Sequence, residues 1–403
     1  MRAIIHKSRA SGSIIAPPSK SYAHRLLIVA ALSNGISKIE NVTLSNDIIA
    51  TLNCIKTLGK DVQIIDDTVI IKSDTNKQLN DILEFDCLES GSTLRFFIPI
   101  ALSTGKKVIF KGTKRLIERG IGPYEEICKN QNIFVEKKTN YIIFNGKLRN
   151  DIFYVPGNIS SQFISGLLFA LPLLEGNSKI VITSSIESKN YIDITLDTMA
   201  KAGISIDNYK NEYIFNSPQK YISNNYIVEG DYSNSAFLDV YNYIGGNVLV
   251  KGLNDNSLQG DSVYKKYFDI LENESATIDL QDSIDLGPIM FAFSAIKKGA
   301  HFTGTERLKI KESDRIADMA TELTKFGVNV ISESNNVYID NSMLHAPNDE
   351  LDGHNDHRIV MALTMLASIY GATINGVEAV NKSYPDFFDK IKQLGIEVEL
   401  HDK

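Results

Sequence analysis

Two short clusters in the second half of the sequence combine cations with carboxylates. Lys311-Glu312-Ser313-Asp314-Arg315 is the more highly charged, and Asn355-Asp356-His357-Arg358 places an arginine at the start of an apolar stretch. On a helix, Lys311 and Arg315 would share a face, and Glu312 would point elsewhere. The cations suit a phosphate or carboxylate ligand. The alternative is a capped, salt-bridged helix at the surface.

The first half contains similar clusters. In Pro17-Pro18-Ser19-Lys20-Ser21-Tyr22-Ala23-His24-Arg25, the prolines favour an extended approach and Ser19 or Ser21 can cap the following helix. Arg25 follows Ser21 by about one helical turn, so both could face one anion. Glu89-Ser90-Gly91-Ser92-Thr93-Leu94-Arg95 repeats the arrangement, with a glycine that permits close approach to the backbone. Taken alone, the first of these clusters is explained equally well by a helix cap with solvated cations.

These clusters belong to a series of six polar or glycine-containing segments, each of which opens into an apolar stretch. A helix start offers free backbone N–H groups and a positive dipole, which attract phosphate or carboxylate. The segments recur roughly every seventy residues, with one shorter gap, as expected for a repeated unit. The predicted helix starts are 19–21, 90–93, 157–162, 230–233, 284–287 and 355–358.

A second repeated pattern follows the helices. A helix ends near a glycine, and two short β-branched runs come next, which predicts a helix cap and then a strand pair. Weaker copies without the glycine follow Asn130-Gln131-Asn132 and Glu272-Asn273. The clearest copies place strands at 62–65 and 68–71, at 204–206 and 213–215, at 328–331 and 337–339, and at 396–400.

Each repeat is therefore predicted to contain a strand, an apolar helix, a strand, an amphipathic helix and a strand pair. Three repeats before about residue 229 and three after it divide the 403 residues into two domains. The first predicted strand, 2–5, precedes the first repeat and could pair with either half. An extended solenoid is the alternative, but the long repeats with polar helix starts favour two compact domains.

The composition narrows the classes of function. A net charge of -7 argues against a general binder of nucleic acid or anionic membranes, so anion affinity must come from local clusters of cations. No GxxxxGK[ST] motif follows a strand, which argues against a nucleoside triphosphate site. With no apolar run near the roughly twenty residues that cross a bilayer, and no presequence, we expect a soluble, cytoplasmic protein.

Metal and disulfide chemistry have little support. The three cysteines, Cys54, Cys87 and Cys128, lack metal-ligand spacing and fit free thiols in a reducing cytosol. His354 and His357 are three residues apart, but no third ligand is obvious. We therefore expect neither a metal site nor an organic cofactor.

Seven motifs in order closely resemble the 5-enolpyruvylshikimate-3-phosphate synthase family. The resemblance runs from residue 17 to about 389, and the combination of Lys-Glu-Ser-Asp-Arg with Asn-Asp-His-Arg is its most specific part. One such motif would mean little, whereas the ordered set is not expected by chance. The motifs are Pro-Ser-Lys-Ser, Ser-Gly-Ser-Thr-Leu-Arg, Glu-Arg-Gly-Ile-Gly, Ser-Ser-Gln, Lys-Glu-Ser-Asp-Arg, Asn-Asp-His-Arg and Lys-Ser-Tyr-Pro-Asp.

The resemblance implies transfer of the enolpyruvyl group of phosphoenolpyruvate to the 5-hydroxyl of shikimate 3-phosphate, with release of phosphate, in the shikimate pathway. It implies an α/β fold of two similar domains, each an inside-out α/β barrel of three βαβαββ repeats, with the active site in the cleft between them. The domains would be 19–229, and 1–18 with 230–403, so the chain would cross between them near Pro17-Pro18 and Glu229-Gly230. We expect a monomer without a cofactor.

The resemblance also assigns the binding residues. Arginine suits both ligands because its planar guanidinium matches carboxylate and phosphate. Shikimate 3-phosphate would contact Lys20, Ser21, Arg25, Ser160, Ser161, Gln162, Ser188, Tyr191, Asp285 and Lys311, with Arg307 an additional contact. Phosphoenolpyruvate would contact Lys20, Gly91, Arg119, Gln162, Arg315, Arg358 and Lys382.

The reaction needs a proton added to the methylene carbon, one removed from the attacking hydroxyl, and later one removed from the methyl group. The resemblance assigns this work to Asp285 and Glu312, with Lys20 as a third candidate. Our hypothesis is that Asp285 handles the hydroxyl proton and Glu312 the carbon-bound proton. The family often has Asn at the position of Glu89, which leaves inhibitor sensitivity open.

Three alternative functions each conflict with a feature of the sequence. UDP-N-acetylglucosamine enolpyruvyl transferase has the same fold and donor, but usually carries a cysteine in the loop that corresponds to 117–123, where this chain has none. A non-catalytic anion-binding protein would need the cations without Asp285 and Glu312. RNA-end phosphate chemistry on a related repeat fold would favour a basic surface, whereas this chain is acidic.

Overall fold

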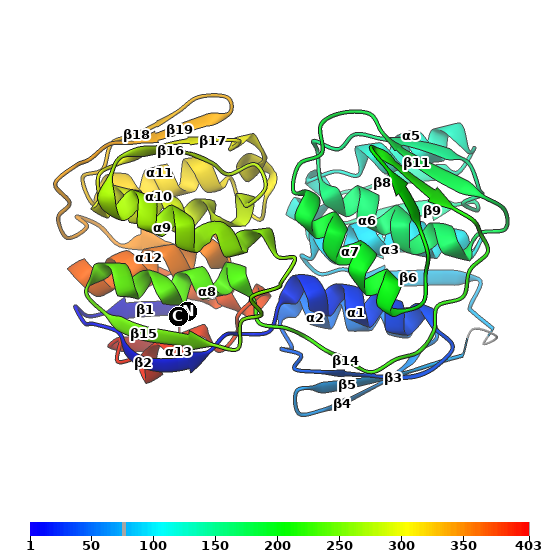
Figure 1. Cartoon of the computed structure of the whole chain (residues 1–403), viewed down its shortest axis with the longest axis horizontal. Coiled ribbons are helices and arrows are strands. Elements are labelled where there is room, and N and C mark those ends of the chain that lie inside the picture. The colour runs from blue at the N-terminus through cyan, green and yellow to red at the C-terminus, as the bar shows by residue number, and fades with distance from the viewer. Residues whose placement is uncertain (75–77, 403) are drawn as a thin grey trace. The chain divides into compact units, whose positions relative to one another are not determined.

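The computed structural model describes residues 1–74 and 78–402, and the chain divides into two compact units (Figure 1). One unit is Pro18–Glu229. The other combines Met1–Pro17 with Gly230–Lys403, so the chain passes from one unit to the other twice. Each unit has α/β architecture, in which helices connect the strands of mixed sheets.

The described part of the Pro18–Glu229 unit contains three four-stranded sheets with one topology. In each sheet the first two strands are parallel, and the second also pairs antiparallel with the last strand of a hairpin. The sheets are β14(Tyr226–Ile227)-β3(Gly35–Glu40)-β5(Thr68–Ser73)-β4(Asp61–Ile65), β6(Ile82–Asp86)-β7(Lys107–Lys111)-β9(Tyr141–Asn145)-β8(Phe134–Lys137) and β10(Ile152–Val155)-β11(Ser178–Ile182)-β13(Glu212–Phe215)-β12(Asp207–Tyr209). The predicted repeat of a strand, helix, strand, helix and strand pair is therefore present.

The residue that ends each amphipathic helix explains where the hairpins form. Gly59 and Gly203 adopt positive φ angles of 75° and 80°, as predicted for helix-ending glycines. Asn132 takes this role in the weaker copy, with φ 55°, because asparagine tolerates the left-handed region better than most residues. One predicted strand, 204–206, is displaced to β12, Asp207–Tyr209.

The helices of this unit are of two kinds. Helices α1, α3 and α6 are apolar on nearly every side and are buried along almost their whole length, as expected for central helices. In Figure 1, β3, β4 and β5 lie along one side of α1 and α2. The helices are α1 (Lys20–Leu32), α2 (Asn46–Thr57), α3 (Gly91–Ser103), α4 (Lys114–Glu118), α5 (Gly122–Asn130), α6 (Ser161–Ala170), η1 (Leu171–Leu173) and α7 (Lys189–Lys201).

The second unit departs from strict repetition. Its described strands form two four-stranded sheets and one two-stranded sheet. The pair is β15-β2, and both larger sheets contain a parallel pair followed by antiparallel partners. The sheets are β16(Ala276–Asp279)-β17(Ala300–Thr303)-β19(Asn336–Ile339)-β18(Val330–Ser332), β20(Leu351–Asp352)-β21(Ala372–Asn375)-β1(Arg2–Ile5)-β22(Val398–His401) and β15(Asn247–Lys251)-β2(Ser11–Ile15).

One sequence expectation is wrong in this unit. The strand pair expected after Glu272-Asn273 does not form in the described residues, because the helix cap Glu274 is extended (φ −149°) and the chain enters β16 directly. The strand predicted at 396–400 is present as β22, and the last sheet is completed by β1 from the N-terminus. The unassigned first strand therefore belongs to the last repeat.

The helices of this unit include three that are almost entirely buried, α8, α10 and α12. Helix α12 packs against both α8 and α10, whereas α9 and α11 are amphipathic and pack on α10. The helices are α8 (Tyr232–Asp239), η2 (Val240–Ile244), η3 (Gly260–Val263), α9 (Tyr264–Asn273), η4 (Ile284–Leu286), α10 (Gly287–Ile296), η5 (Glu306–Ile310), α11 (Arg315–Lys325), α12 (His357–Tyr370), η6 (Val377–Lys382) and α13 (Phe387–Gln393).

Candidate functional site

All six predicted helix starts are confirmed, at the first turns of α1, α3, α6, α8, α10 and α12. Five have a side-chain cap that accepts a hydrogen bond from a backbone N–H two or three residues later. The sixth, α10, follows the short turn η4 and has proline in its first turn in place of a capping side chain. The caps are Ser19, Ser90, Ser160, Asp231 and Asp356.

At the start of α1, Lys20 forms an ion pair with Asp47 of α2, with Nζ 2.7 Å from Oδ2. Both side chains are largely shielded from solvent, with exposed fractions of 17% and 13%. Ser19 rather than Ser21 caps the helix. Sequence reasoning did not single out Asp47, which lies in the first turn of α2 in the same repeat.

Arg25 is buried below the first turn of α1. Its guanidinium donates to Ser21 O (2.7 Å), to Thr195 Oγ1 (2.7 Å) and to Tyr191 O (2.9 Å). Burial lowers the pKa of Arg25 to about 10. The ring of Phe96 lies 5.0 Å from the guanidinium carbon, close enough for a cation–π contact. The structure thus brings Ser21, Arg25 and Tyr191 together.

A second group joins α3, α6 and the segment after α4. Gln162 Nε2 donates to Ser92 Oγ (2.9 Å), and Arg95 Nη1 donates to Gln162 Oε1 (2.7 Å). The Arg119 guanidinium lies directly over Gly91, where a Cβ would come within 2.9 Å of Nη1. Arg119 is the residue that caps the C-terminus of α4, three residues before α5 begins. Sequence reasoning left Arg95 unassigned, although it stands in the motif that contains Gly91.

The remaining predicted residues of this unit are serines at helix starts. Ser160 caps α6, and Ser161 is its first residue and is buried. Ser188 precedes α7 in the left-handed conformation (φ 54°, ψ 46°), and its carbonyl accepts from Tyr191 N. Each serine therefore lies at the polar end of a buried or half-buried helix.

In the other unit, the cluster at 311–315 differs from the expected surface helix. Helix α11 begins only at Arg315, because Asp314 caps it by accepting from the backbone N–H groups of residues 316 and 317. Lys311 and Glu312 therefore lie before the helix. Glu312 does not point away, since its Oε2 accepts from Arg315 Nη2 at 2.8 Å. The arginine side chain is only 1% exposed, which excludes the surface alternative.

Asp285, in η4 just before α10, is the meeting point of three cations. Its Oδ1 lies 2.9 Å from Arg315 Nη1 and 3.2 Å from Lys311 Nζ, and its Oδ2 lies 3.3 Å from Arg358 Nη2. Burial alone would raise the pKa of Asp285, but Arg358, Lys311 and Arg315 together hold it well below its usual range. Residues far apart in the sequence thus form one charged cluster.

A second carboxylate, Asp356, organises the same arginines. It caps α12 through Arg358 N (2.9 Å) and accepts from Arg315 Nε (2.8 Å) and Nη2 (3.3 Å). Its side chain is fully buried. Arg358 Nη1 in turn donates to Ser233 Oγ (2.7 Å) at the start of α8. Sequence reasoning did not single out Asp356 and Ser233 as members of this cluster, although both stand within predicted helix starts.

The last two predicted residues contact backbone carbonyls. Arg307 Nη2 donates to Gln281 O, and Lys382 Nζ donates to Asn355 O at 2.6 Å. Both side chains belong to short 3-10 helices, η5 and η6. Asn355 immediately precedes the α12 cap, so Lys382 is tied to the segment that also carries Arg358.

Residues 1–74 and 78–402 contain no group of three or more histidine, cysteine or acidic side chains that could hold a metal ion. His354 instead contacts Asp318 and Glu322. The three cysteines are free and buried. Every described helix is too short or too polar to cross a bilayer.

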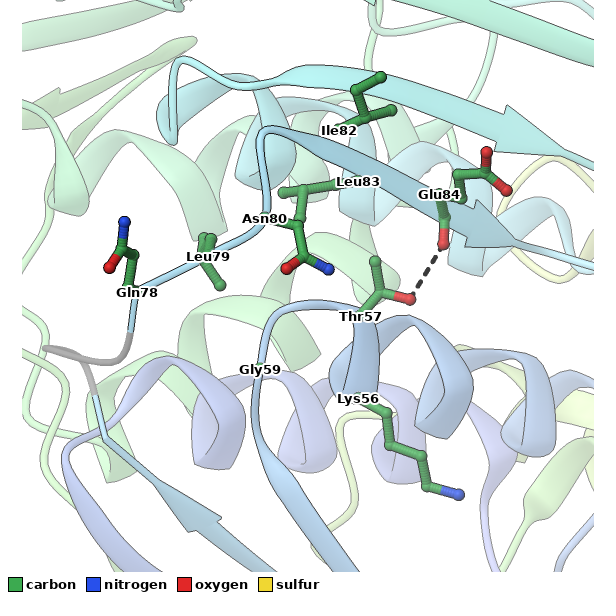
Figure 2. A pocket seen from close by; sticks show the side chains of 9 residues that line it. All are labelled: Lys56, Thr57, Gly59, Gln78, Leu79, Asn80, Ile82, Leu83 and Glu84. Carbon is green, nitrogen blue, oxygen red and sulfur yellow. Dashed lines mark hydrogen bonds between the residues drawn. The ribbon is translucent and has the colours of Figure 1, made fainter.

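A pocket of about 550 Å³ lies beside the end of α2 and the start of β6 (Figure 2). Thr57 Oγ1 donates to Glu84 O at its edge, at 3.0 Å. The predicted binding and catalytic residues do not line it. Its lining is Lys56, Thr57, Gly59, Gln78, Leu79, Asn80, Ile82, Leu83 and Glu84.

Comparison with known proteins agrees with the sequence resemblance. The profile of the family described as EPSP synthase (3-phosphoshikimate 1-carboxyvinyltransferase) matches residues 4–391. A protein from Clostridium novyi (strain NT) that is named 3-phosphoshikimate 1-carboxyvinyltransferase is 40% identical over 422 residues, and the match covers 96% of each chain. Another from Clostridioides difficile (strain 630) is 39% identical over 429 residues, covering 97% of each.

Similarity extends to a solved structure. The 2.37 Å structure of EPSP synthase from Acinetobacter baumannii matches with a TM-score of 0.79 and 21% identity, covering 99% of this chain and 100% of that one. At this identity the match shows the fold, and the relatives above show the family. The chain therefore belongs to the EPSP synthase family.

Proposed function

We propose that the chain transfers the enolpyruvyl group of phosphoenolpyruvate to the 5-hydroxyl of shikimate 3-phosphate, giving 5-enolpyruvylshikimate 3-phosphate and phosphate. The observation that carries this proposal is Asp285, surrounded by Lys311, Arg315 and Arg358, with Glu312 on the same arginine. Cations of this density suit multiply anionic substrates, and the two carboxylates suit proton transfer. The named relatives do not favour a UDP-N-acetylglucosamine enolpyruvyl transferase.

We further infer that both units serve this one reaction as its two domains, 19–229 and 1–18 with 230–403, each an inside-out α/β barrel. The first unit would supply Lys20 and the groups around Arg25 and Gln162, and the second the Asp285 cluster. Shikimate 3-phosphate and phosphoenolpyruvate would be divided among these residues as the family resemblance assigns them. We also infer a monomeric, cytoplasmic enzyme, which light scattering and cell fractionation would test.

The chemistry of Asp285 follows from its partners. Three cations depress its pKa, which keeps it ionised but makes it a weak base. A substrate phosphate or carboxylate that pairs with Arg315, Lys311 or Arg358 would weaken their hold on Asp285 and raise its pKa. Substrate binding would thereby prepare the carboxylate to accept the proton of the attacking hydroxyl.

Glu312 would handle the carbon-bound proton. It shares the Arg315 guanidinium with Asp285, but its own contact is to Nη2 rather than Nη1. Two carboxylates on different edges of one guanidinium can act on different atoms of the substrates. Lys20 remains the third candidate for proton transfer.

A phosphate-release assay tests the reaction. Phosphate should appear only when phosphoenolpyruvate and shikimate 3-phosphate are both present, and UDP-N-acetylglucosamine should not replace the second substrate. Release with phosphoenolpyruvate alone, or with UDP-N-acetylglucosamine, contradicts the proposal.

Two variants test the catalytic roles. Asp285→Ala should lower kcat by on the order of a hundredfold or more, whereas the exposed neighbour variant Asp282→Ala should not. Near-normal turnover of Asp285→Ala would remove its role.

When the Glu312→Gln variant turns over in D2O, we expect deuterium to enter the methylene group of the product on the order of a hundredfold more slowly than in the unmodified enzyme. The exposed Glu306→Gln is its matched control. Deuterium entry at the rate of the unmodified enzyme would exclude Glu312 as the group that transfers this proton.

A further inference from the structure

The segment Gly353–Asp356, just before α12, contacts two of the cations that the second unit would present to phosphoenolpyruvate, and it caps the helix turn that carries the third, Arg358. Asn355 O accepts from Lys382, Asp356 accepts from Arg315, and Asp356 caps the helix at Arg358 N. A shift of this segment would therefore displace all three cations together.

The backbone of this segment is in a conformation that needs support. His354 and Asn355 are consecutive non-glycine residues in the left-handed region, with φ of 48° and 52°. Such residues cost of order 1 kcal/mol or more each and persist only where surrounding contacts hold them. The backbone contacts Gly353 N to Asn375 O and Asp356 N to Gly353 O, both 2.8 Å, supply part of this support.

The side chain of His354 also supports the backbone conformation of this segment. Its Nε2 lies 2.9 Å from Glu322 Oε1, and its Nδ1 lies 3.3 Å from Asp318 Oδ1, both on α11. Its backbone N–H donates to Asp352 Oδ1 at 2.7 Å. Because a neutral imidazole donates from only one nitrogen, only the imidazolium can donate to both carboxylates.

The surroundings keep these carboxylates in place. Glu322 is almost fully buried and also accepts from Lys325 Nζ (2.9 and 3.0 Å) and from Asp352 N (3.0 Å). Asp318 is about one-fifth exposed. The charged groups that face the imidazole are therefore Asp318 and Glu322 from α11 and Asp352 from β20, with Lys325 beyond Glu322.

We propose that the imidazolium of His354 is a positioning group, which holds Gly353–Asp356 against α11 and so orients Arg315, Arg358 and Lys382 for phosphoenolpyruvate. This inference rests on the proposed function. His354 makes no contact with the reacting atoms in this scheme. It acts on the affinity for one substrate through the segment that joins the three cations.

The direction of the pH effect follows from the contacts. The hydrogen bond to Glu322, with help from Asp318, raises the pKa of His354 above its ordinary value despite partial burial. The support is therefore complete below about pH 6.5, the value of an unperturbed histidine, and is lost as pH rises through the higher value in the folded protein. The KM for phosphoenolpyruvate should rise over that window, while kcat changes little.

Two substitutions isolate this effect. His354→Asn removes the cation, and asparagine tolerates the left-handed backbone. If the competent arrangement falls to between a tenth and a fifth of molecules, KM for phosphoenolpyruvate rises roughly five- to tenfold already at pH 6.5. His354→Lys keeps a charge that does not titrate below pH 9, so its KM should stay low between pH 6.5 and 9.

The matched control is His6→Asn, which removes a histidine of the same unit that also pairs with a carboxylate, Glu399, but lies just after β1. Its pH profile should equal that of the unmodified enzyme. The substrates and the other side chains titrate in the same way in every variant. Their effects therefore cancel when the pH profile of KM of a variant is compared with that of the unmodified enzyme. The role is overturned if His354→Asn retains the pH-dependent KM, or if His354→Lys does not flatten it.

A measurement on the unmodified protein guards against variants that fail to fold. Imidazole NMR titration, with the His354 resonance assigned by its absence in His354→Asn or His354→Lys, should give a pKa above about 6.5. A lower value overturns the proposal. If the unmodified enzyme releases no phosphate from the two substrates, the proposed function fails instead, and the NMR result still decides the state of His354.

Discussion

At the scale of single residues, Arg315 holds the charged cluster together. Its buried guanidinium contacts Asp285, Glu312 and Asp356 through Nη1, Nη2 and Nε respectively. Only a planar fork with several fixed donors can serve three carboxylates at once. A buried ion of this kind is costly unless every partner is present, so its geometry is tightly constrained.

Arg315→Lys should therefore be damaging although it conserves charge. An ammonium on a flexible stem cannot replace the fork, and each lost charge-assisted hydrogen bond costs about 1.5–3 kcal/mol. We expect the free energy of unfolding to fall by about 2–4 kcal/mol, and kcat/KM by on the order of a hundredfold. Urea unfolding and steady-state kinetics measure both, with the exposed Arg149→Lys as control. Unchanged values for Arg315→Lys would contradict this role.

Asp261 gives a second residue-scale prediction. Burial, with the nearby charge of Asp285, raises its pKa to about 6. Between about 3.9, the unfolded value, and this folded value, the folded state binds more protons than the unfolded state. Folding stability is therefore lost as pH rises through that window.

Asp261→Asn removes this titration. The variant should be more stable than the unmodified protein at pH 7.5 by on the order of 1–3 kcal/mol, and the difference should vanish near pH 4. Urea unfolding across pH 4–8 measures the difference, with the exposed Asp282→Asn as control. A difference that grows toward low pH would show that the sign is wrong.

At the scale of elements, the first turn of α3 and the residue that ends α4 form a close contact. Gly91 is the first residue of α3, and the Arg119 guanidinium occupies the space in which a side chain would stand. The absence of a Cβ therefore sets how closely Arg119 approaches the helix start. An anion at this start would meet both the backbone N–H groups and Arg119.

Gly91→Ala should move Arg119 without unfolding α3, because alanine favours helix. Its Cβ would lie 2.9–3.1 Å from the guanidinium atoms, so Arg119 must shift. We expect KM for phosphoenolpyruvate to rise about tenfold or more, since a displacement near 1 Å in a binding group is costly. Gly122→Ala is the matched control, as Gly122 also begins a helix and a Cβ there meets no atom within 4 Å. Equal kinetics for both variants would exclude this contact as important.

At the scale of the whole molecule, the N-terminal segment is part of the unit that lies after residue 229. β1 lies between β21 and β22, with Ala3 opposite Ile374 on one side and Leu400 on the other. β2 is the partner of β15 over five residues. Pro18–Glu229, by contrast, contains every strand of its own three described sheets, including β14.

This difference predicts different behaviour of the fragments. Residues 18–229 should fold alone with a cooperative thermal transition. Residues 230–403 should not, because β22 would lose its neighbour in the sheet, and covalent linkage of 1–17 should restore folding. Circular dichroism melts and hydrogen exchange test this, and a cooperative transition of 230–403 alone would contradict it.

The local features of this protein could be predicted because their causes are local. Capping serines and aspartates, helix-ending glycines and apolar stretches fixed the six helix starts and most hairpins, since each depends on a few neighbouring residues. The motif order also predicted the family. At 311–315, however, charge spacing suggested a helix, and the cap at Asp314 delayed its start to Arg315.

The amino-acid sequence by itself thus determined the repeated elements, the polar helix starts and the family. Only the tertiary structure decided that Asp285 meets Lys311, Arg315 and Arg358, that Lys20 meets Asp47, and that β1 enters the last sheet. These contacts join residues 26 to 373 positions apart. Their partners are chosen by packing and charge in the folded unit, and no local propensity encodes such a choice.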